Sequence, residues 1–382
     1  YDVYTTNSPM NGSNNQLPAS KRNPDLKNER TNSIEAGLEL SLFKSRLGFD
    51  LALYKTNSLD QILPLTVSQT TGFQSMMINA GEIENKGIEV QFNANPINIG
   101  SFRWDINLNW SKNMNKVVSL YPGITNLRLN STNLQDGLTV NAEVGKPYGE
   151  IRGSDYTYDA GGNIIIDPDD GKPVVTSSSA IPIGNFTPDW TGGINNSFSY
   201  KNLSFNFLID IQKGGDIWSL DMCYGLSSGL YPETAFINDL GNPVRDPLVG
   251  DASEGYGANS GGYIIKGVNV VDGISTPNKT RVDATNAFGF GIGLLPHSAF
   301  IYDAGFVKLR EVVLTYRLPS QWLNKTFIKG VSLSAIASNL WMHKNLPYAD
   351  PESGMSAGNI QGYTTGSLPT TRDFSFNLKL NF

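Results

Sequence analysis

Apolar and polar residues alternate strictly along the last nine residues of the chain, 374–382, where Ser, Asn and Lys separate Phe and Leu. This period of two predicts a β-strand with one apolar and one polar face. A strand of this kind that ends on an aromatic residue is typical of outer-membrane β-barrels, where one face meets lipid and the other a polar lumen. A half-buried strand of a soluble sandwich has the same period. In a barrel, Phe374, Phe376 and Phe382 form a signal for assembly into the membrane.

The same alternation recurs in eight earlier segments, and their length favours the membrane. Strands of soluble proteins average roughly five or six residues. Residues 102–110 span about 26 Å along a strand, or about 20 Å of height at a tilt of about 40°, close to the apolar band of a barrel. We therefore predict an all-β fold, an antiparallel transmembrane β-barrel. The nine predicted strands begin near Ser33, Leu47, Gly87, Ser101, Trp190, Leu203, Ala304, Gly330 and Thr371.

Short and long connections alternate between these strands, as periplasmic turns and extracellular loops do in such barrels. The long connections are residues 56–84, 113–188, 214–300 and 343–370. Residues 214–300 are thus expected to form a long extracellular loop. Residues 149–159 also look extended. They either belong to an extracellular hairpin or form one of two additional spanning strands, so the expected number of strands is nine to eleven. We favour the hairpin. A change of phase between Leu309 and Val312 predicts a β-bulge.

Composition is compatible with this interpretation. Mean hydropathy is −0.24, and a barrel strand hides its lipid face in the alternation, so a hydropathy scan misses it. The net charge of −6 gives no basic footprint for nucleic acid. Cys223 is the single cysteine, so no internal disulfide can form. The chain opens in a polar run over residues 5–28, and we expect it to be a fragment that begins inside a loop.

Several segments carry a resemblance to a known family. They lie in order along the chain at residues 23–31, 79–89, 183–193, 306–319, 350–352 (Asp-Pro-Glu) and 368–372. With them, the chain resembles the C-terminal part of the barrel of SusC/RagA-type TonB-dependent transporters of Bacteroidota, over nearly its whole length. One departure is the pair Asn28-Glu29, where the family more often has Pro-Glu.

The resemblance implies a multi-pass outer-membrane importer of oligosaccharides or peptides, with a plugged barrel of roughly 22 strands. It also implies a SusD-like surface lipoprotein as partner, a dimer of transporter–lipoprotein pairs, and coupling to TonB through an N-terminal half that this chain lacks. On this interpretation, residues 1–382 are the C-terminal part of the barrel, without the plug domain. A passive porin and a soluble carbohydrate-active β-protein are the alternatives.

The sequence offers little material for catalysis. His297 and His343, both assigned to loops with an exposed polar role, and Cys223 leave few nucleophiles or bases, so we expect no enzyme. No cofactor is expected. Asp167 and Asp169 resemble the start of a calcium loop, but Lys172 stands where that loop needs glycine. An acidic turn is the simpler interpretation, with Ca²⁺ as the alternative.

Aromatic residues near the long loops are the candidates for ligand contact, because sugar-binding surfaces combine aromatic faces with hydrogen-bonding groups. Packing of the same rings within the loop, or against a partner protein, is the alternative that we prefer. The candidate residues are Trp218, Tyr224, Tyr231, Tyr256, Trp341 and Tyr363.

Overall fold

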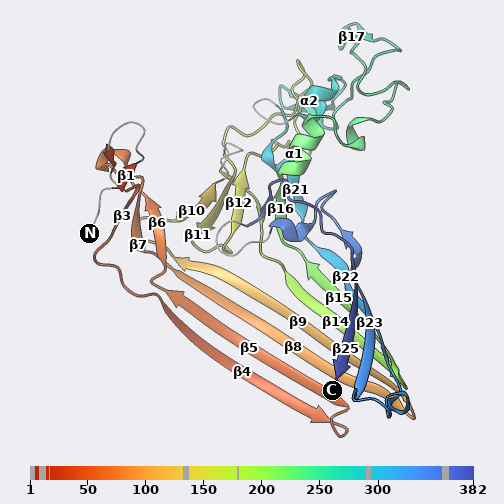
Figure 1. Cartoon of the computed structure of the whole chain (residues 1–382). Coiled ribbons are helices and arrows are strands. Elements are labelled where there is room, and N and C mark those ends of the chain that lie inside the picture. The colour runs from red at the N-terminus through yellow and green to blue at the C-terminus, as the bar shows by residue number, and fades with distance from the viewer. Residues whose placement is uncertain are drawn as a thin grey trace.

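A curved nine-stranded antiparallel sheet forms the lower half of the computed structural model (Figure 1). The structure describes residues 5–7, 14–16, 18–131, 137–178, 180–289, 294–354 and 361–382. Each strand of the sheet pairs with its neighbours in chain order, so the sheet is a continuous meander, and it is called the wall below. The wall strands are β4 (Arg30–Leu42), β5 (Leu47–Leu59), β8 (Glu82–Ile99), β9 (Phe102–Ser119), β14 (Trp190–Tyr200), β15 (Leu203–Lys213), β22 (Phe306–Arg317), β23 (Gly330–Lys344) and β25 (Asp373–Asn381).

These nine strands are the nine that the alternation predicts, which confirms the all-β antiparallel fold. Most begin within three residues of the predicted positions, whereas β8 begins at Glu82, before the expected Gly87. β8 and β9 are 18 residues long. Their upper ends pair beyond the apolar stretch, as far as Glu82 opposite Ser119. Polar residues continue these two strands above the apolar band, where the alternation of apolar residues gives no signal.

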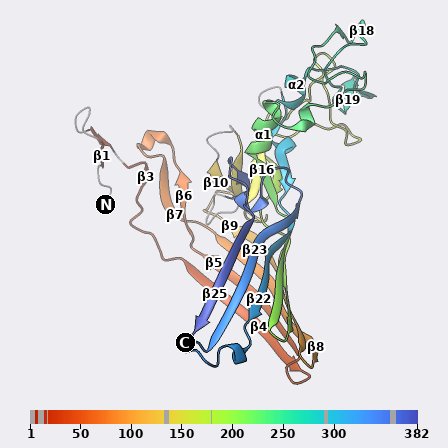
Figure 2. The same ribbon diagram turned by 45° about the vertical axis from the view of Figure 1, so that its right-hand side comes forward.

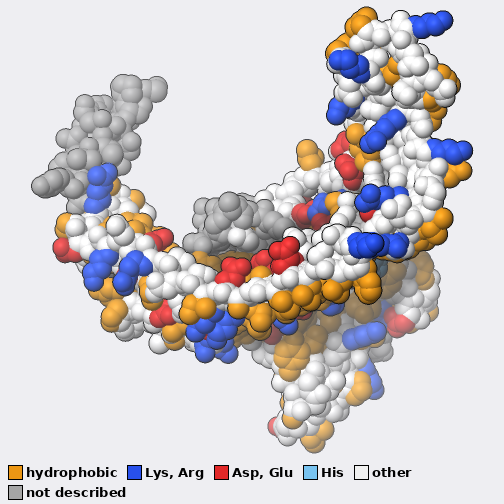
Figure 3. Space-filling model, turned by 90° about the horizontal axis from the view of Figure 1, so that it is seen from below, with side chains coloured by type: hydrophobic (Ala, Val, Ile, Leu, Met, Phe, Trp, Pro, Cys, Tyr) orange, Lys and Arg blue, Asp and Glu red, His pale blue; other side chains and the backbone are white. Residues whose placement is uncertain are grey.

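The pairing register separates the two faces of the wall. One cross-strand row on the convex face is Leu51, Val90, Trp110, Gly192, Ile211 and Val307. The next row on the concave face is Gln91, Asn109, Gly193, Asp210 and Lys308. Figure 3 shows hydrophobic side chains along the convex side and acidic ones on the concave side. The convex face therefore suits lipid and the concave face a wet lumen.

The predicted bulge lies at Arg310. Leu208 pairs with Glu311 and Ile209 pairs with Leu309, so Arg310 is left over between them. The pairing of β22 with β23 shifts at the same place. The extra residue restores the apolar phase on the convex face, and it lets Lys308, Arg310 and Glu311 share the lumenal side.

Smaller elements form a cap of loops above the wall (Figures 1 and 2). Three small sheets there contain more than two strands each: β3–β7–β6, β10–β11–β12–β13 and β21–β16–β24. Their strands are β3 (Ser20–Lys21), β6 (Ile62–Thr66), β7 (Ser75–Asn79), β10 (Asn126–Ser131), β11 (Thr139–Glu143), β12 (Glu150–Gly153), β13 (Ile181–Asn185), β16 (Asp216–Ser219), β21 (Ile301–Asp303) and β24 (Tyr363–Thr364). The two-stranded hairpins and the helices are β1 (Thr5–Asn7) with β2 (Asn14–Gln16), β17 (Gly250–Asp251) with β18 (Gly255–Tyr256), β19 (Val268–Val271) with β20 (Ile274–Pro277), α1 (Leu220–Ser227) and α2 (Ala284–Phe288).

Residues 149–159 do not cross the membrane, and the strand within them belongs to a hairpin above the wall, as we expected: β12 pairs antiparallel with β11 across residues 144–149. β12 is a central strand of the four-stranded sheet, between β11 and β13. The residues after β12 form only isolated bridges, from Tyr156 to Val175 and from Tyr158 to Ile164. The second partner of β12 is β13, and 27 residues separate these two strands, a distance along the chain that local patterning does not reveal.

A compact apolar core holds the loops above the wall. Trp218, Met222, Cys223 and Phe300 are almost fully buried there, with Leu138, which directly precedes β11, and Ile151 of β12. Burial raises the pKa of the Cys223 thiol to about 12, so it is protonated and unreactive. Among the described residues, no helix is long and apolar enough to cross a membrane.

The wall has two open edges. Among the strands that the structure describes, β4 and β25 each pair on one side only, and their residues are exposed throughout. The C-terminus lies at the lower end of the wall (Figure 2). There the Phe382 ring stacks on Phe327 at 5.7 Å, and Lys329 donates a hydrogen bond to the Phe382 carbonyl. The terminal aromatic residue thus packs onto the connection between β22 and β23.

Candidate functional site

The concave face carries two adjoining hollows lined mainly by hydrogen-bonding groups. The larger, of about 430 Å³, lies over the middle strands β9, β14, β15 and β22. The second, of about 420 Å³, adjoins it toward the loops and includes Arg310 and Asp210. Both fall within the roughly 300–1,000 Å³ of ligand pockets. Polar residues from all four strands line the first, namely Asp105, Asn107, Asn195, Ser197, Asn206 and Glu311.

The strand register explains why these groups converge. Asn107 pairs with Asn195, and Asp105 pairs with Ser197, so their side chains stand beside each other on the lumenal face. Arg103 forms an ion pair with Asp105 at 2.7 Å, and Asn95 donates to the same carboxylate at 3.0 Å. The hollow therefore offers amides, hydroxyls and carboxylates together, which suit a ligand with many hydroxyl or peptide groups.

An ionic cluster links the wall to the extracellular segment before the last strand. On β22, the ammonium of Lys308 lies 2.6 Å from Asp350, and it also contacts Glu352. Arg310 donates to Asp210 on β15 at 2.7 Å and to Glu352 at 2.6 Å. The side chains of Lys308 and Asp350 are only 3% and 5% exposed. A short 3₁₀ turn, Pro351–Gly354, is thereby fixed to the lumenal side of the wall.

The cluster fixes the ionisation of its loop carboxylates. Burial opposes ionisation of Asp350, but hydrogen bonds from Lys308 and Thr370 outweigh it and lower the pKa of Asp350. Burial likewise opposes the charge on Glu352, and hydrogen bonds from Arg310 and Lys308 lower its pKa. Both carboxylates are therefore charged at neutral pH.

The sequence alone does not reveal this cluster as a unit. The signals were present in two separate segments: a lysine and an arginine beside the predicted bulge, and the acidic pair in the Asp-Pro-Glu motif at 350–352. Lys308 and Asp350 are 42 residues apart, and only the tertiary fold brings them together.

Three of the six aromatic candidates for ligand contact pack within the loops. Trp218 is 1% exposed, and its indole N–H donates to the His297 carbonyl at 3.1 Å. Tyr363 pairs with Trp218 and packs against the same core. Tyr256 exchanges two hydrogen bonds with the Arg281 backbone, and its ring lies under the Arg281 guanidinium. These contacts support the packing alternative for all three.

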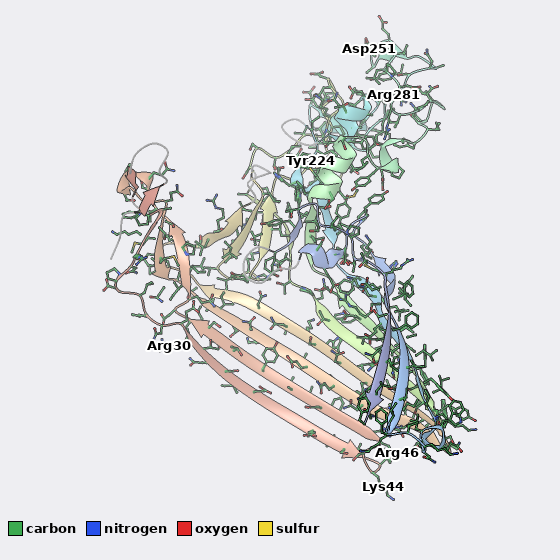
Figure 4. All side chains as sticks on the ribbon, viewed as in Figure 1. Arg30, Lys44, Arg46, Tyr224, Asp251 and Arg281 are labelled. Carbon is green, nitrogen blue, oxygen red and sulfur yellow. The ribbon has the colours of Figure 1, made fainter. Side chains whose placement is uncertain are left out.

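Tyr224 and Tyr231 lie around α1, high above the lower turns that Lys44 and Arg46 mark (Figure 4). The Tyr224 side chain is 54% exposed. Tyr231 stacks face to face on Tyr348, with ring centroids 4.1 Å apart. The Tyr348 hydroxyl donates to Glu233 at 2.9 Å. This pair joins the long loop to the segment before β25, and it presents aromatic edges at the cap.

Trp341 lies on a wall strand rather than in a loop. On β23 it pairs with Leu309 of β22, which places it on the convex face, and it is 53% exposed. A ring in this position meets the membrane side and not the lumen.

Both histidines depart from their expected places. His297 is 4% exposed and not solvated, because its Nδ1 accepts a hydrogen bond from the Ser154 amide at 3.0 Å and lies 2.8 Å from the Ser154 hydroxyl. His343 lies within β23, because that strand runs on to Lys344, beyond the predicted start of the loop.

The acidic segment at Asp167 and Asp169 is a turn whose side chains bond to its own backbone. The Asp167 carboxylate accepts from the Asp169 amide at 2.8 Å, and Asp170 accepts from the Lys172 amide at 2.9 Å. Among the described residues, no group of three or more His, Cys, Asp or Glu side chains is placed to hold a metal ion.

Comparisons with known proteins agree with this architecture. The family described as TonB dependent receptor-like, beta-barrel matches residues 1–294. TonB-dependent receptor P26 of Formosa agariphila is 27% identical over 94% of this chain and 35% of its own length. TonB-dependent receptor SusC of Bacteroides thetaiotaomicron is 24% identical over 94% of this chain and 32% of its own. This chain thus spans about a third of these relatives.

Among solved structures, the RagAB peptide transporter superposes with a TM-score of 0.69 at 19% identity. The match covers 100% of this chain and 38% of the transporter chain, and it shows a shared fold. The apolar convex face, the polar lumenal face and the family match agree. The chain therefore belongs to the TonB-dependent receptor β-barrel family, with SusC- and RagA-type relatives, and it is a protein of the outer membrane.

Proposed function

We propose that this chain is the C-terminal part of the barrel of an active importer that takes up oligosaccharides or peptides with a SusD-like surface lipoprotein. TonB, acting through the remainder of the polypeptide, drives the uptake. The main observation that supports this proposal is the lumenal face, where amides and carboxylates converge beneath a broad cap of loops. The names of the relatives support the proposal, since one is SusC and another is part of a peptide transporter.

The chemistry of the hollow favours a polar, extended substrate. Asn107, Asn195 and Asn206 each offer two donors and an acceptor, and Asp105 and Glu311 offer acceptors. Sugar hydroxyls and peptide groups both match such a set, so the proposal keeps both substrate classes. Exposed aromatic side chains at the cap, Tyr224 and the Tyr231–Tyr348 pair, are proposed contacts for the substrate or for the lipoprotein.

The test is an uptake assay on cells that express the full-length protein. A labelled oligosaccharide mixture and a labelled peptide mixture are offered with and without the proton gradient that drives TonB. We expect uptake of one class to stop when the gradient is dissipated. Uptake that continues unchanged would instead show a passive porin.

A double variant and its control test whether the hollow contributes to uptake. Asn107→Ala combined with Asn195→Ala removes hydrogen bonds that line it, and uptake should fall by roughly tenfold or more, since each hydrogen bond is worth about 0.5–1.5 kcal/mol. Asn196→Ala is the matched control, because Asn196 points to the convex face and accepts from Trp104. Native mass spectrometry of the complex, extracted in mild detergent, should show a stoichiometric lipoprotein.

A further inference from the structure

The convex face of the wall has an apolar groove that four neighbouring strands line. It has a volume of about 410 Å³ and lies between β8, β9, β14 and β15. Its floor is at Gly192, which sits between Trp110 on one neighbouring strand and Ile211 on the other. Because glycine has no side chain, the row of apolar side chains is interrupted there. The indoles of Trp110 and Trp190 stand at its rim.

The groove lies in the upper part of the membrane-spanning band. Tyr200, at the lower end of β14, is 53% exposed on the convex face, and Trp190 is at the upper end of the same strand. Ten residues separate them, about 33 Å of strand, or about 25 Å of height at a tilt of about 40°. This height matches the apolar band, so Trp110 and Trp190 stand where an upper aromatic girdle is expected. The groove therefore faces the outer leaflet.

Two lysines lie next to the upper end of the groove. Lys213 pairs with Trp190, and Lys112 follows Trp110 on the same face of β9. The strands that carry them are two strand spacings apart, roughly 10 Å, which two flexible lysine side chains can bridge around one anion. Within the described part of the chain, neither lysine has an ion pair, whereas Lys55 and Lys86 in the same zone both bind Glu84.

We propose that this groove is a binding site for one phosphate-bearing lipid of the outer leaflet. An acyl chain lies over Gly192 between Trp110 and Trp190, and the phosphate is bound by Lys112 and Lys213. The groove is continuous with the surface that already faces lipid, so a membrane lipid reaches it without crossing a polar region. The two cations at its polar end complement a phosphate. This site is distinct from the lumen, and it does not depend on which substrate is imported.

Lipid titration followed by native mass spectrometry of the full-length protein in detergent tests the site. The probes are dimyristoyl phosphatidic acid, which carries a phosphate monoester, and dimyristoyl phosphatidylcholine, which has the same chains without net charge. We expect one saturable adduct with phosphatidic acid, bound roughly tenfold more tightly than phosphatidylcholine. Adducts that accumulate without saturation, equally for both lipids, would overturn the proposal, because they indicate general lipid coating.

Removing the two lysine charges should weaken binding of the phosphate group and leave binding of the acyl chain unchanged. Lys112→Gln with Lys213→Gln should weaken phosphatidic acid binding by roughly tenfold and leave phosphatidylcholine within about twofold. The matched control is Lys44→Gln with Lys325→Gln. Both lysines are exposed; Lys44 lies in the lower turn between β4 and β5 (Figure 4), and Lys325 lies in the connection between β22 and β23. An equal effect of both double variants would overturn the proposed headgroup site. Each of the two single variants should show part of the loss in phosphatidic acid binding. They therefore test the proposal even where the double variant fails to assemble.

Filling the groove with a larger side chain should weaken binding of the acyl chain. Ile211 pairs directly with Gly192, so the ring in Ile211→Phe should cover the glycine and occupy the floor. Binding of both lipids should then fall by a similar factor, in contrast to the lysine variants. Unchanged binding of both lipids would show that the chain does not lie in the groove, and would overturn the proposal. Heat-modifiable migration on gels confirms that each variant still forms a barrel.

Discussion

Ile106 and Asn107 are neighbours on β9 with opposite surroundings. Ile106 faces the convex side and pairs with Asn196, whereas Asn107 lines the lumenal hollow. We predict that Ile106→Arg destabilises the assembled barrel by roughly 2–4 kcal/mol, because it places a charge near the middle of the bilayer. The measurement is urea unfolding of the full-length protein in vesicles. Asn107→Arg is the matched control and should cost less than about 1 kcal/mol, since the lumen is wet. A larger cost for Asn107→Arg would reverse the assignment of faces.

Lys308 stabilises two carboxylates that are otherwise poorly solvated. We predict that Lys308→Met lowers the local stability of the segment around Asp350 by roughly 3–5 kcal/mol, because it leaves a buried charge without its partner. Hydrogen exchange of residues 350–354 measures this opening. Combining Lys308→Met with Asp350→Asn should recover part of the loss, since the buried negative charge is then removed as well. Strict additivity of the two substitutions would show that the pair is not coupled.

The segment between β23 and β25 is attached to the wall through ionised groups, so its attachment depends on pH. The lowered pKa values of Asp350 and Glu352 mean that their stabilisation is complete above the ordinary carboxyl range, about 4, and is lost as pH falls through the lowered values. We predict an unchanged attachment from pH 8 to 5 and release below about pH 4. A spin label at Ser367→Cys, an exposed position in this segment, reports the release as increased mobility.

The same label in an Asp350→Asn, Glu352→Gln variant should be mobile throughout the pH range, because the ion pairs are absent. A mobility change centred between pH 5 and 7 in the parent protein would contradict this origin, since neither carboxylate titrates there.

Phe382 ends the last wall strand and packs on the connection between β22 and β23, through its stack on Phe327. We predict that deletion of Phe382 lowers the amount of barrel assembled in the outer membrane several-fold, because β25 loses the contact that holds its lower end. Cell fractionation and heat-modifiable migration on gels measure assembly. Phe382→Tyr is the control and should assemble normally, since the aromatic stack remains. Normal assembly of the deletion variant would show that Phe382 is not part of an assembly signal.

The wall strands and the bulge at Arg310 were predictable because they depend on neighbouring residues. Alternation identifies a strand wherever one face meets lipid, and the change of phase beside Arg310 marks the extra residue. The small sheets above the wall do not have one face toward lipid. β12 pairs with β13 although 27 residues separate the two strands, and β24 pairs with β16, so these two pairings follow from tertiary contacts alone. The aromatic candidates show the same limit, because composition cannot distinguish the buried Trp218 from the exposed Tyr224.

At the scale of the whole molecule, the open edges β4 and β25 determine what the wall needs in a membrane. Each presents a row of backbone groups beside which no strand of the described residues lies. An unpaired N–H or C=O in the hydrocarbon region costs several kcal/mol, so the barrel must close around both edges. We predict that in the full-length protein the amides of both strands exchange as slowly as those of the central strand β14. Hydrogen exchange with mass spectrometry measures this. Fast exchange along β4, with β14 protected, would mean that this edge borders water and that the wall closes elsewhere.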